Sequence, residues 1–86
     1  MSFVSRMSES ADLVAGMATR LDIDFADRIA AAPDTAVRSF ASMVMRCTGC
    51  RDHAACRKLQ DENLMLDAAP DYCRNRDVLI PPAQRD

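Results

Sequence analysis

Four cysteines in the second half of this 86-residue chain have the spacing of a metal-binding set. They are Cys47, Cys50, Cys56 and Cys73, in the pattern C-x2-C-x5-C-x16-C. Four thiols are the number that closes a tetrahedral zinc site or holds an iron–sulfur cluster. The x2 spacing lets one turn of chain place two sulfurs on one ion, and Cys73 must fold back across the preceding helix. We therefore predict that these four side chains are the ligands of one metal centre.

The single histidine offers a second ligand set. His53 stands three residues from both Cys50 and Cys56, which fits a Cys3His site with Cys73 left over. The other interpretation of His53 is an exposed surface residue that binds nothing.

The spacing leaves two metal groups open. Zinc fingers usually pair two close CxxC elements, and this chain has one. One close trio with a later fourth cysteine is more typical of iron–sulfur ligation. An iron–sulfur cluster and a zinc ion both remain hypotheses.

Two interpretations of the thiols need no metal. Cys47-Thr48-Gly49-Cys50 could act as a CxxC pair in thiol–disulfide exchange, but that motif normally opens a helix in a βαβ context, which is not evident here. Free cysteines are also among the most buried residues, so all four could be core or structural thiols.

Composition and charge exclude several classes of function. Lys and Arg number 11 against 13 Asp and Glu, a net charge of −2, which argues against a general nucleic-acid binder. Local cations surround the cysteines and could stabilise thiolates, or else form a solvated helix face: Arg46, Arg51, Arg57 and Lys58. The N-terminus has no secretory pattern and no segment resembles a membrane span, so we expect a cytoplasmic protein with reduced thiols.

Hydrophobic periodicity predicts an all-α fold, a compact bundle of four to five short helices in one domain spanning residues 1–86. An apolar stripe at helical spacing defines the first helix: Val4, Met7, Ala11, Val14, Ala18 and Leu21. Ser8 or Ser10 is expected to cap it, which would leave residues 1–7 as a frayed arm. No segment alternates as a strand would, and no hairpin signal occurs.

Caps and breakers place the later elements. Asp22 or Asp24 is expected to start a short second helix, and Pro33 a third that runs into Cys47. Thr48-Gly49 should end the third helix through a left-handed glycine. Its buried stripe is expected to be Val37, Phe40, Ala41, Val44 and Met45. A fourth helix is predicted over residues 52–65, then a turn at 69–71, one or two helical turns over 74–80, and a tail over 81–86.

The cysteine segment resembles a known family. Residues 45–59 and the later Ala69-Pro-Asp-Tyr-Cys-Arg-Asn are similar to a family of small uncharacterised proteobacterial domains. Its members share a CxxC, a third cysteine on the next helix and a Pro-x-aromatic-Cys-x-Asn element. The resemblance implies a helical fold with a shared site on the four cysteines, and no established activity. Members tend to have Pro after the last cysteine, where this chain has Arg74.

Together these patterns predict a small protein with a redox- or metal-responsive accessory role that acts through a protein partner. We expect no enzymatic activity; a dithiol oxidoreductase would need a cysteine with a depressed pKa. The alternative is a helical interaction module whose cysteines are structural thiols or disulfides. The apolar stripe over residues 4–21 makes a homodimer conceivable.

Overall fold

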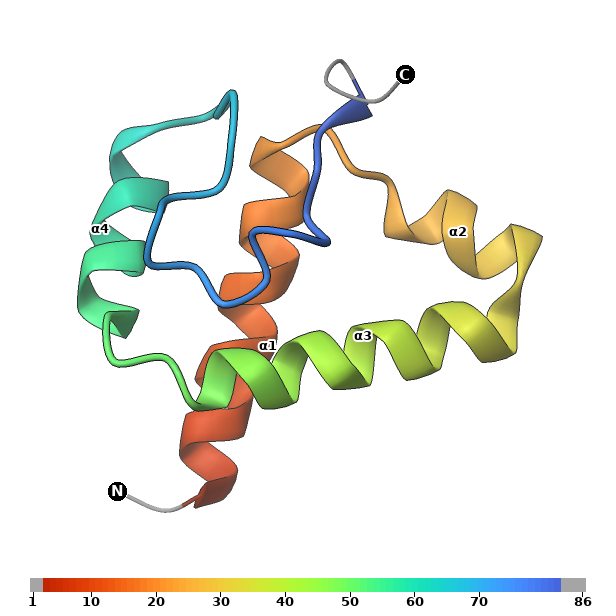
Figure 1. Cartoon of the computed structure of the whole chain (residues 1–86), viewed down its shortest axis with the longest axis horizontal. Coiled ribbons are helices and arrows are strands. Elements are labelled where there is room, and N and C mark those ends of the chain that lie inside the picture. The colour runs from red at the N-terminus through yellow and green to blue at the C-terminus, as the bar shows by residue number, and fades with distance from the viewer. Residues whose placement is uncertain (1–2, 83–86) are drawn as a thin grey trace.

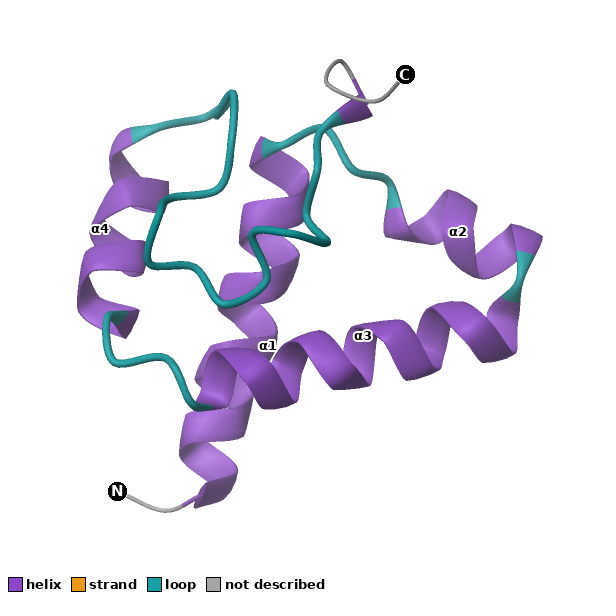
Figure 2. Ribbon diagram, in the orientation of Figure 1, coloured by secondary structure: helices purple, strands orange, loops and turns teal. Residues whose placement is uncertain are grey.

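Four helices form the described part of the chain, residues 3–82, in this computed structural model (Figure 1). They are α1 (Phe3–Arg20), α2 (Phe25–Ala31), α3 (Pro33–Thr48) and α4 (His53–Glu62). Residues 63–82 follow as turns and loop, and no strand occurs among residues 3–82 (Figure 2). The all-α prediction is confirmed.

Helix α1 is the central element of the fold. Both α3 and α4 pack against it, whereas α2 packs mainly against α3 (Figure 1). The α1 face that packs inward is buried at Leu13, Val14, Met17 and Ala18, and Leu21 directly after the helix is buried as well. Leu79, which is 1% exposed, brings the C-terminal loop back into this core. The loop after α4 therefore belongs to the structural core.

Helix α1 begins earlier than the caps predicted. It is helical from Phe3, so the cap at Ser8 or Ser10 is wrong, and residues 3–7 are helix. Ser10 is fully buried at 0% exposure and faces α3, which makes it a packing residue. The serines carried a capping signal, but the continuous apolar stripe of the helix outweighed it.

The junctions around α2 follow the predicted chemistry. Asp24 is the N-cap of α2, where its carboxylate accepts a hydrogen bond from the Asp27 backbone N–H at 3.1 Å. Pro33 opens α3 at its first turn. Gly49 ends α3 as predicted, but at φ −82° it is right-handed, so the left-handed mechanism is wrong. The Gly49 N–H donates to the carbonyl oxygens of Arg46 and Cys47 instead.

The buried face of α3 is shifted from the predicted one. Met43 and Val44 are buried and Phe40 and Cys47 partly so, whereas Val37, Ala41 and Met45 are exposed. Both faces carry apolar residues at helical spacing, and only the direction of α1 decides between them. The stripe prediction is therefore wrong for three of its five residues.

The chain after α4 is less helical than predicted. Helix α4 ends at Glu62, three residues short of Met65, because the C-cap Asn63 adopts an extended backbone. Arg20 donates to the carbonyl oxygens of Gln60 and Asn63 there, at 2.9 and 2.8 Å. Residues 74–80 form turns, with the Leu79 N–H donating to the Asn75 carbonyl at 2.8 Å. Of the predicted 81–86 tail, residues 83–86 lie outside the described residues.

Candidate metal centre

The four cysteine side chains line one cavity, about 20 Å³ in volume. Side chains from α1 and from the loop after α4 complete its wall: Leu13, Val14, Met17, Tyr72, Arg74, Asn75 and Leu79. A space of this size holds a single water-sized occupant. The cavity walls are otherwise mainly apolar, so the sulfurs are its principal soft donors.

Three different local structures deliver the sulfurs. Cys47 lies in the last turn of α3, and Gly49 then turns the chain so that Cys50 follows outside the helix. Cys56 is on the buried face of α4. Cys73 closes a turn in which its N–H donates to the Pro70 carbonyl at 3.0 Å. Pro70 thus places Cys73 as its turn signal predicted.

Two of the sulfurs accept hydrogen bonds from their own backbone two residues on. The Asp52 N–H donates to Cys50 Sγ at 3.4 Å. The Asn75 backbone makes the equivalent bond to the Cys73 sulfur. Cys50-Arg-Asp52 and Cys73-Arg-Asn75 are therefore two copies of one small motif, in which an amide donates to a thiol two residues before it. Such bonds to sulfur stabilise thiolates and tune thiolate-bound metals.

The other two sulfurs accept hydrogen bonds from side chains. Gln60 Nε2 donates to Cys56 Sγ at 3.4 Å and to the Leu13 carbonyl at 2.9 Å. Buried Ser10 donates to the Cys47 sulfur. Every cysteine in the cavity is thus the acceptor of a donor on a neighbouring element or turn.

Gly16 makes the Gln60 contact possible. A Cβ at Gly16 would collide with Oε1 at the end of the Gln60 side chain, so glycine leaves the room that this side chain occupies against α1. Packing against Gln60 therefore accounts for a glycine in the interior of α1.

Helix α1 also fixes the loop that carries Cys50. The Arg6 guanidinium donates through Nε to the Thr48 carbonyl at 2.7 Å and through Nη2 to the Cys50 carbonyl at 2.6 Å. This fork satisfies carbonyl groups that the end of α3 leaves without helical partners.

His53 is buried, and the interpretation as an exposed surface residue is wrong. It is 8% exposed; Nδ1 lies 2.6 Å from Glu9 Oε1 and Nε2 lies 2.6 Å from the Cys47 carbonyl oxygen. Nε2 must donate to the carbonyl, and Nδ1 is engaged with the Glu9 carboxyl group, so neither ring nitrogen is directed at an ion. His53 also does not line the cysteine cavity. The geometry therefore opposes the Cys3His ligand set.

The same contacts argue against a thiol nucleophile. Cys47 Sγ lies 3.7 Å from His53 Nε2, and Glu9 lies behind the ring, an arrangement with the outline of a catalytic triad. The Nε2 hydrogen, however, is directed to the Cys47 carbonyl, so this nitrogen cannot take a proton from the thiol. Glu9 and His53 instead hold the end of α3 in place.

Burial raises the pKa of three of the thiols. Desolvation raises the pKa of Cys47 to about 11 despite the hydrogen bond from Ser10, and the other three cysteines add repulsion. Desolvation likewise raises the pKa of Cys56 and of Cys73. Because the four sulfurs line one cavity, ionising any of them is opposed both by burial and by the neighbouring thiols.

The side chains do not form a finished coordination sphere. Among residues 3–82, no three His, Cys, Asp or Glu side chains are arranged as a metal-holding group. The four thiols are chemically suited to a soft metal ion, but rotation about χ1 would have to bring at least three of them together to hold one.

A comparison with protein families decides where the chain belongs. A family model described as "Family of unknown function (DUF6455)" matches residues 1–84. The chain belongs to this family. No curated protein and no solved structure matches it. Within the described residues of this DUF6455 member, no helix is both long and apolar enough to cross a membrane.

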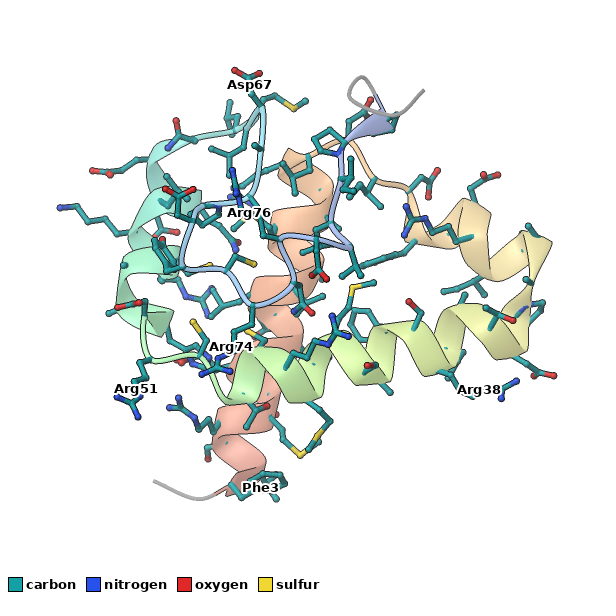
Figure 3. All side chains as sticks on the ribbon, viewed as in Figure 1. Phe3, Arg38, Arg51, Asp67, Arg74 and Arg76 are labelled. Carbon is teal, nitrogen blue, oxygen red and sulfur yellow. The ribbon has the colours of Figure 1, made fainter. Side chains whose placement is uncertain are left out.

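Of the basic residues near the cysteines in the DUF6455 chain, Arg57 and Arg74 act on the cysteine cavity, and Arg46, Arg51 and Lys58 do not. Arg57 lowers the pKa of Cys56, a smaller effect than the opposing desolvation, and Arg46 instead pairs with Asp77 at 3.7 Å. Arg51 and Lys58 are exposed. Arg74, which the sequence marked only as a departure from the family pattern, lines the cavity and extends over Gly49 at the α3–α4 corner (Figure 3).

Sequence reasoning missed the donors that surround the sulfurs. Ser10, Gln60 and Asn75 are all buried polar residues, and each contacts a cysteine. One signal was available for Asn75, because Cys73-Arg74-Asn75 repeats the pattern of Cys50-Arg51-Asp52. No sequence signal marked Ser10 or Gln60, since both depend on how α1 meets its neighbours.

Proposed function

We propose that this DUF6455 protein binds one thiophilic metal ion with donors drawn from Cys47, Cys50, Cys56 and Cys73. The observation that carries the proposal is the convergence of four sulfurs on one ion-sized cavity, each with a hydrogen-bond donor directed at it. Thiolate donors favour zinc among the common biological divalent ions.

The size of the cavity favours a single ion over an iron–sulfur cluster. About 20 Å³ accommodates one water-sized centre, whereas a cluster adds several iron and sulfide atoms. A cluster would require Leu13, Val14 and Met17, each at most 2% exposed, to move outward from the core.

The thiol environment opposes the dithiol oxidoreductase hypothesis. A reactive cysteine needs a depressed pKa, and burial raises the pKa of Cys47 to about 11. A metal ion changes this balance, because its charge offsets the repulsion among thiolates that burial makes costly.

The biological role that suits such a centre is a metal-responsive accessory function in the bacterial cytoplasm, exercised through a protein partner. We also propose that the family is proteobacterial and that its members share the cysteine motifs. Metal binding would tie the 70–75 turn, α3 and α4 to one ion, so the shape of the partner-binding surface would depend on metal supply. The interaction module without a metal is the competing hypothesis.

A metal titration of the reduced protein tests the proposal. Under anaerobic conditions we expect one Zn²⁺ per chain and a higher unfolding midpoint than in the presence of a chelator, because an ion bound only by the folded state stabilises it. Cys56→Ser should abolish stoichiometric binding. Full retention of zinc by this variant would overturn the ligand assignment.

Val14→Ala is the matched control. Val14 lines the same cavity but offers no donor, and it is 2% exposed, so the substitution should lower stability by about 1–3 kcal/mol. It should still bind one zinc ion. Equal loss of zinc in both variants would mean that general unfolding explains the Cys56→Ser result.

A further inference from the structure

Two of the four cysteines lie opposite each other, one at the α3–α4 corner and one in the loop after α4. Cys50 Sγ lies 4.0 Å from the Tyr72 carbonyl oxygen, and Cys73 follows Tyr72 directly along the chain. Arg74 Nε lies 3.8 Å from the position that a Cβ of Gly49 would occupy. The residues on both sides of Cys73 therefore contact the short segment 49–50, which places Cys73 across from Cys50.

The Cys50 and Cys73 sulfurs also share one local setting. The Asp52 N–H donates to Cys50 Sγ at 3.4 Å, and the Asn75 backbone donates in the same way to the Cys73 sulfur. Both cysteines lie in non-helical chain and line the same cavity. Because no helical turn restricts χ1 at either position, both side chains can rotate toward each other while α3 and α4 keep their places.

The other two cysteines are helical, and their sulfurs are held by side chains. Cys47 lies in the last turn of α3, where its sulfur accepts from Ser10 and lies 3.7 Å from His53 Nε2. Cys56 lies in α4, where Gln60 Nε2 donates to its sulfur at 3.4 Å. A bond that includes either of them requires a helical residue to turn its sulfur away from these contacts.

We propose that Cys50 and Cys73 form a reversible disulfide bond when the metal-free protein meets a low-molecular-weight disulfide. A disulfide needs two sulfurs, so it does not require the group of three donors that the described residues do not assemble. It requires Cα atoms about 4.4–6.8 Å apart. The bond covalently joins the α3–α4 corner to the loop that carries Leu79 into the core. This inference goes beyond the proposed metal function and does not rest on it.

The bond forms in two thiol–disulfide exchange steps. Cys73, the less buried of the two, loses its proton and attacks one sulfur of the small disulfide, whose S–S bond breaks to release one small thiol. Cys50 then loses its proton and attacks Cys73 Sγ, and the second small thiol leaves. Two protein thiols are oxidised, and one small disulfide is reduced to two thiols. Burial raises the pKa of Cys73, so the first step is slow and the bond is a slowly formed link, not a catalytic one.

Peptide mapping tests the pairing. The full-length protein is incubated with a chelator and glutathione disulfide, alkylated in urea and digested with trypsin without reduction. Because trypsin cleaves after Lys and Arg, Cys47 and Cys50 share the peptide 47–51, whereas Cys56 and Cys73 fall in peptides 52–57 and 59–74. We expect a disulfide between peptides 47–51 and 59–74. A bond within 47–51, a bond to 52–57, or glutathione adducts alone would overturn the inference.

Two matched double variants identify which cysteine of peptide 47–51 is joined. Cys47→Ser/Cys56→Ser retains the proposed pair and should form the bond at a rate within about twofold of the wild-type rate. Cys50→Ser/Cys56→Ser retains Cys47 and Cys73 and should form a bond more than about tenfold more slowly. Equal rates would contradict the pairing. Circular dichroism establishes that both variants fold; if one does not, mapping of Cys47→Ser decides, because Cys50 is then the sole cysteine of its peptide.

Oxidation in urea separates the effect of the fold from that of the sequence. The cost of closing a loop rises with its length, so in the unfolded chain the bonds between neighbours, Cys47–Cys50 and Cys50–Cys56, should dominate. A Cys50–Cys73 bond that dominates equally in urea would mean that the fold does not select it. The two proposals fail separately: absence of zinc binding leaves this disulfide intact, and a different disulfide leaves the metal function intact.

Discussion

Two regions of this molecule are built from similar helices but stabilised in different ways. The cysteine end comprises residues 47–60 and 70–79 with the facing turns of α1. The arm comprises α2 and the facing turns of α3, residues 25–40. In the cysteine end, polar side chains bond across distant elements: Arg6, Glu9, Gln60 and Asn75. In the arm, the polar contacts are local: Asp24 caps α2, and Arg38 donates to the Asp34 carbonyl one turn earlier in its own helix.

The arm leaves apolar surface exposed. No residue of α2 is buried, and Phe25 packs edge-on against Phe40 with ring centroids 5.4 Å apart. Ile29 and Val37, 45% and 60% exposed, line a groove of about 190 Å³ between α2 and α3.

The difference shows where chemistry can reside. Long-range polar bonds fix backbone positions, which a ligand set requires, whereas apolar contacts tolerate small shifts of one helix against another. We therefore expect ligand-linked effects in the cysteine end and packing effects in the arm.

The largest expected effect comes from metal binding. Zinc at a thousandfold excess over its Kd should stabilise the folded protein by about 4 kcal/mol. Hydrogen exchange measured with and without zinc should slow across residues 47–60 and 69–79, and change little across 25–37. Equal slowing in the arm would mean that the two regions respond as one unit.

Removal of the buried imidazole should have the next largest effect. His53→Ala loses its bonds to Glu9 and to the Cys47 carbonyl, and should lower the free energy of unfolding by about 2–3 kcal/mol in urea denaturation. Arg28→Ala is the control in the arm. It removes a guanidinium group that lies 5.8 Å from the centroid of the Phe25 ring, and should lower the free energy of unfolding by about 0.5 kcal/mol. Similar losses in both variants would contradict the comparison.

Replacing Gly16 by alanine in the cysteine end should destabilise the protein, although alanine normally stabilises a helix relative to glycine. Gly16→Ala gains about 1 kcal/mol of helix propensity but displaces Gln60, so we expect a net loss of about 1 kcal/mol. In the arm, Ser39→Ala at an exposed position of α3 should stabilise by a few tenths of a kcal/mol. Thermal unfolding of both variants measures the contrast, and a more stable Gly16→Ala protein would refute the close packing of α1 on α4.

The smallest effect is the change in the free energy of unfolding with pH that Cys47 causes in the metal-free protein between pH 8 and 10. The pKa of Cys47 is raised from 9.0 to about 11 in the folded state, so the folded protein holds this proton more tightly than the unfolded chain. The resulting stability is fully present below pH 9 and is lost as pH rises toward 11. Urea denaturation at pH 8 to 10 with a chelator should show a steeper decline for the wild-type protein than for Cys47→Ala. Parallel declines would exclude Cys47 as the cause.

The sequence was sufficient for features that depend on local signals. Apolar periodicity, the Asp24 cap, Pro33 and Gly49 located most helix boundaries. The buried side of α3 was not predictable, because Val37 and Met45 satisfy the same spacing as Phe40 and Met43. Only the position of α1 distinguishes the two faces.

The candidate site divides in the same way. The type and number of the four cysteines were enough to indicate a candidate site, and the structure brings their side chains to one cavity. The role of His53 was not predictable, since it depends on Glu9, 44 residues away on another helix. Gln60 and Asn75 were missed for the same reason, because their bonds to the Leu13 and Met43 carbonyls span 47 and 32 residues.

The most direct test of the metal centre is elemental analysis of protein purified anaerobically, with an absorption spectrum of the same sample. We predict about one zinc per chain, no acid-labile sulfide and no visible absorption, as a single thiolate-bound zinc ion requires. Iron with matching sulfide and a broad visible band would contradict the single ion in favour of a cluster. Metal-free protein with four titratable thiols that also fails to bind added zinc would contradict the metal centre itself.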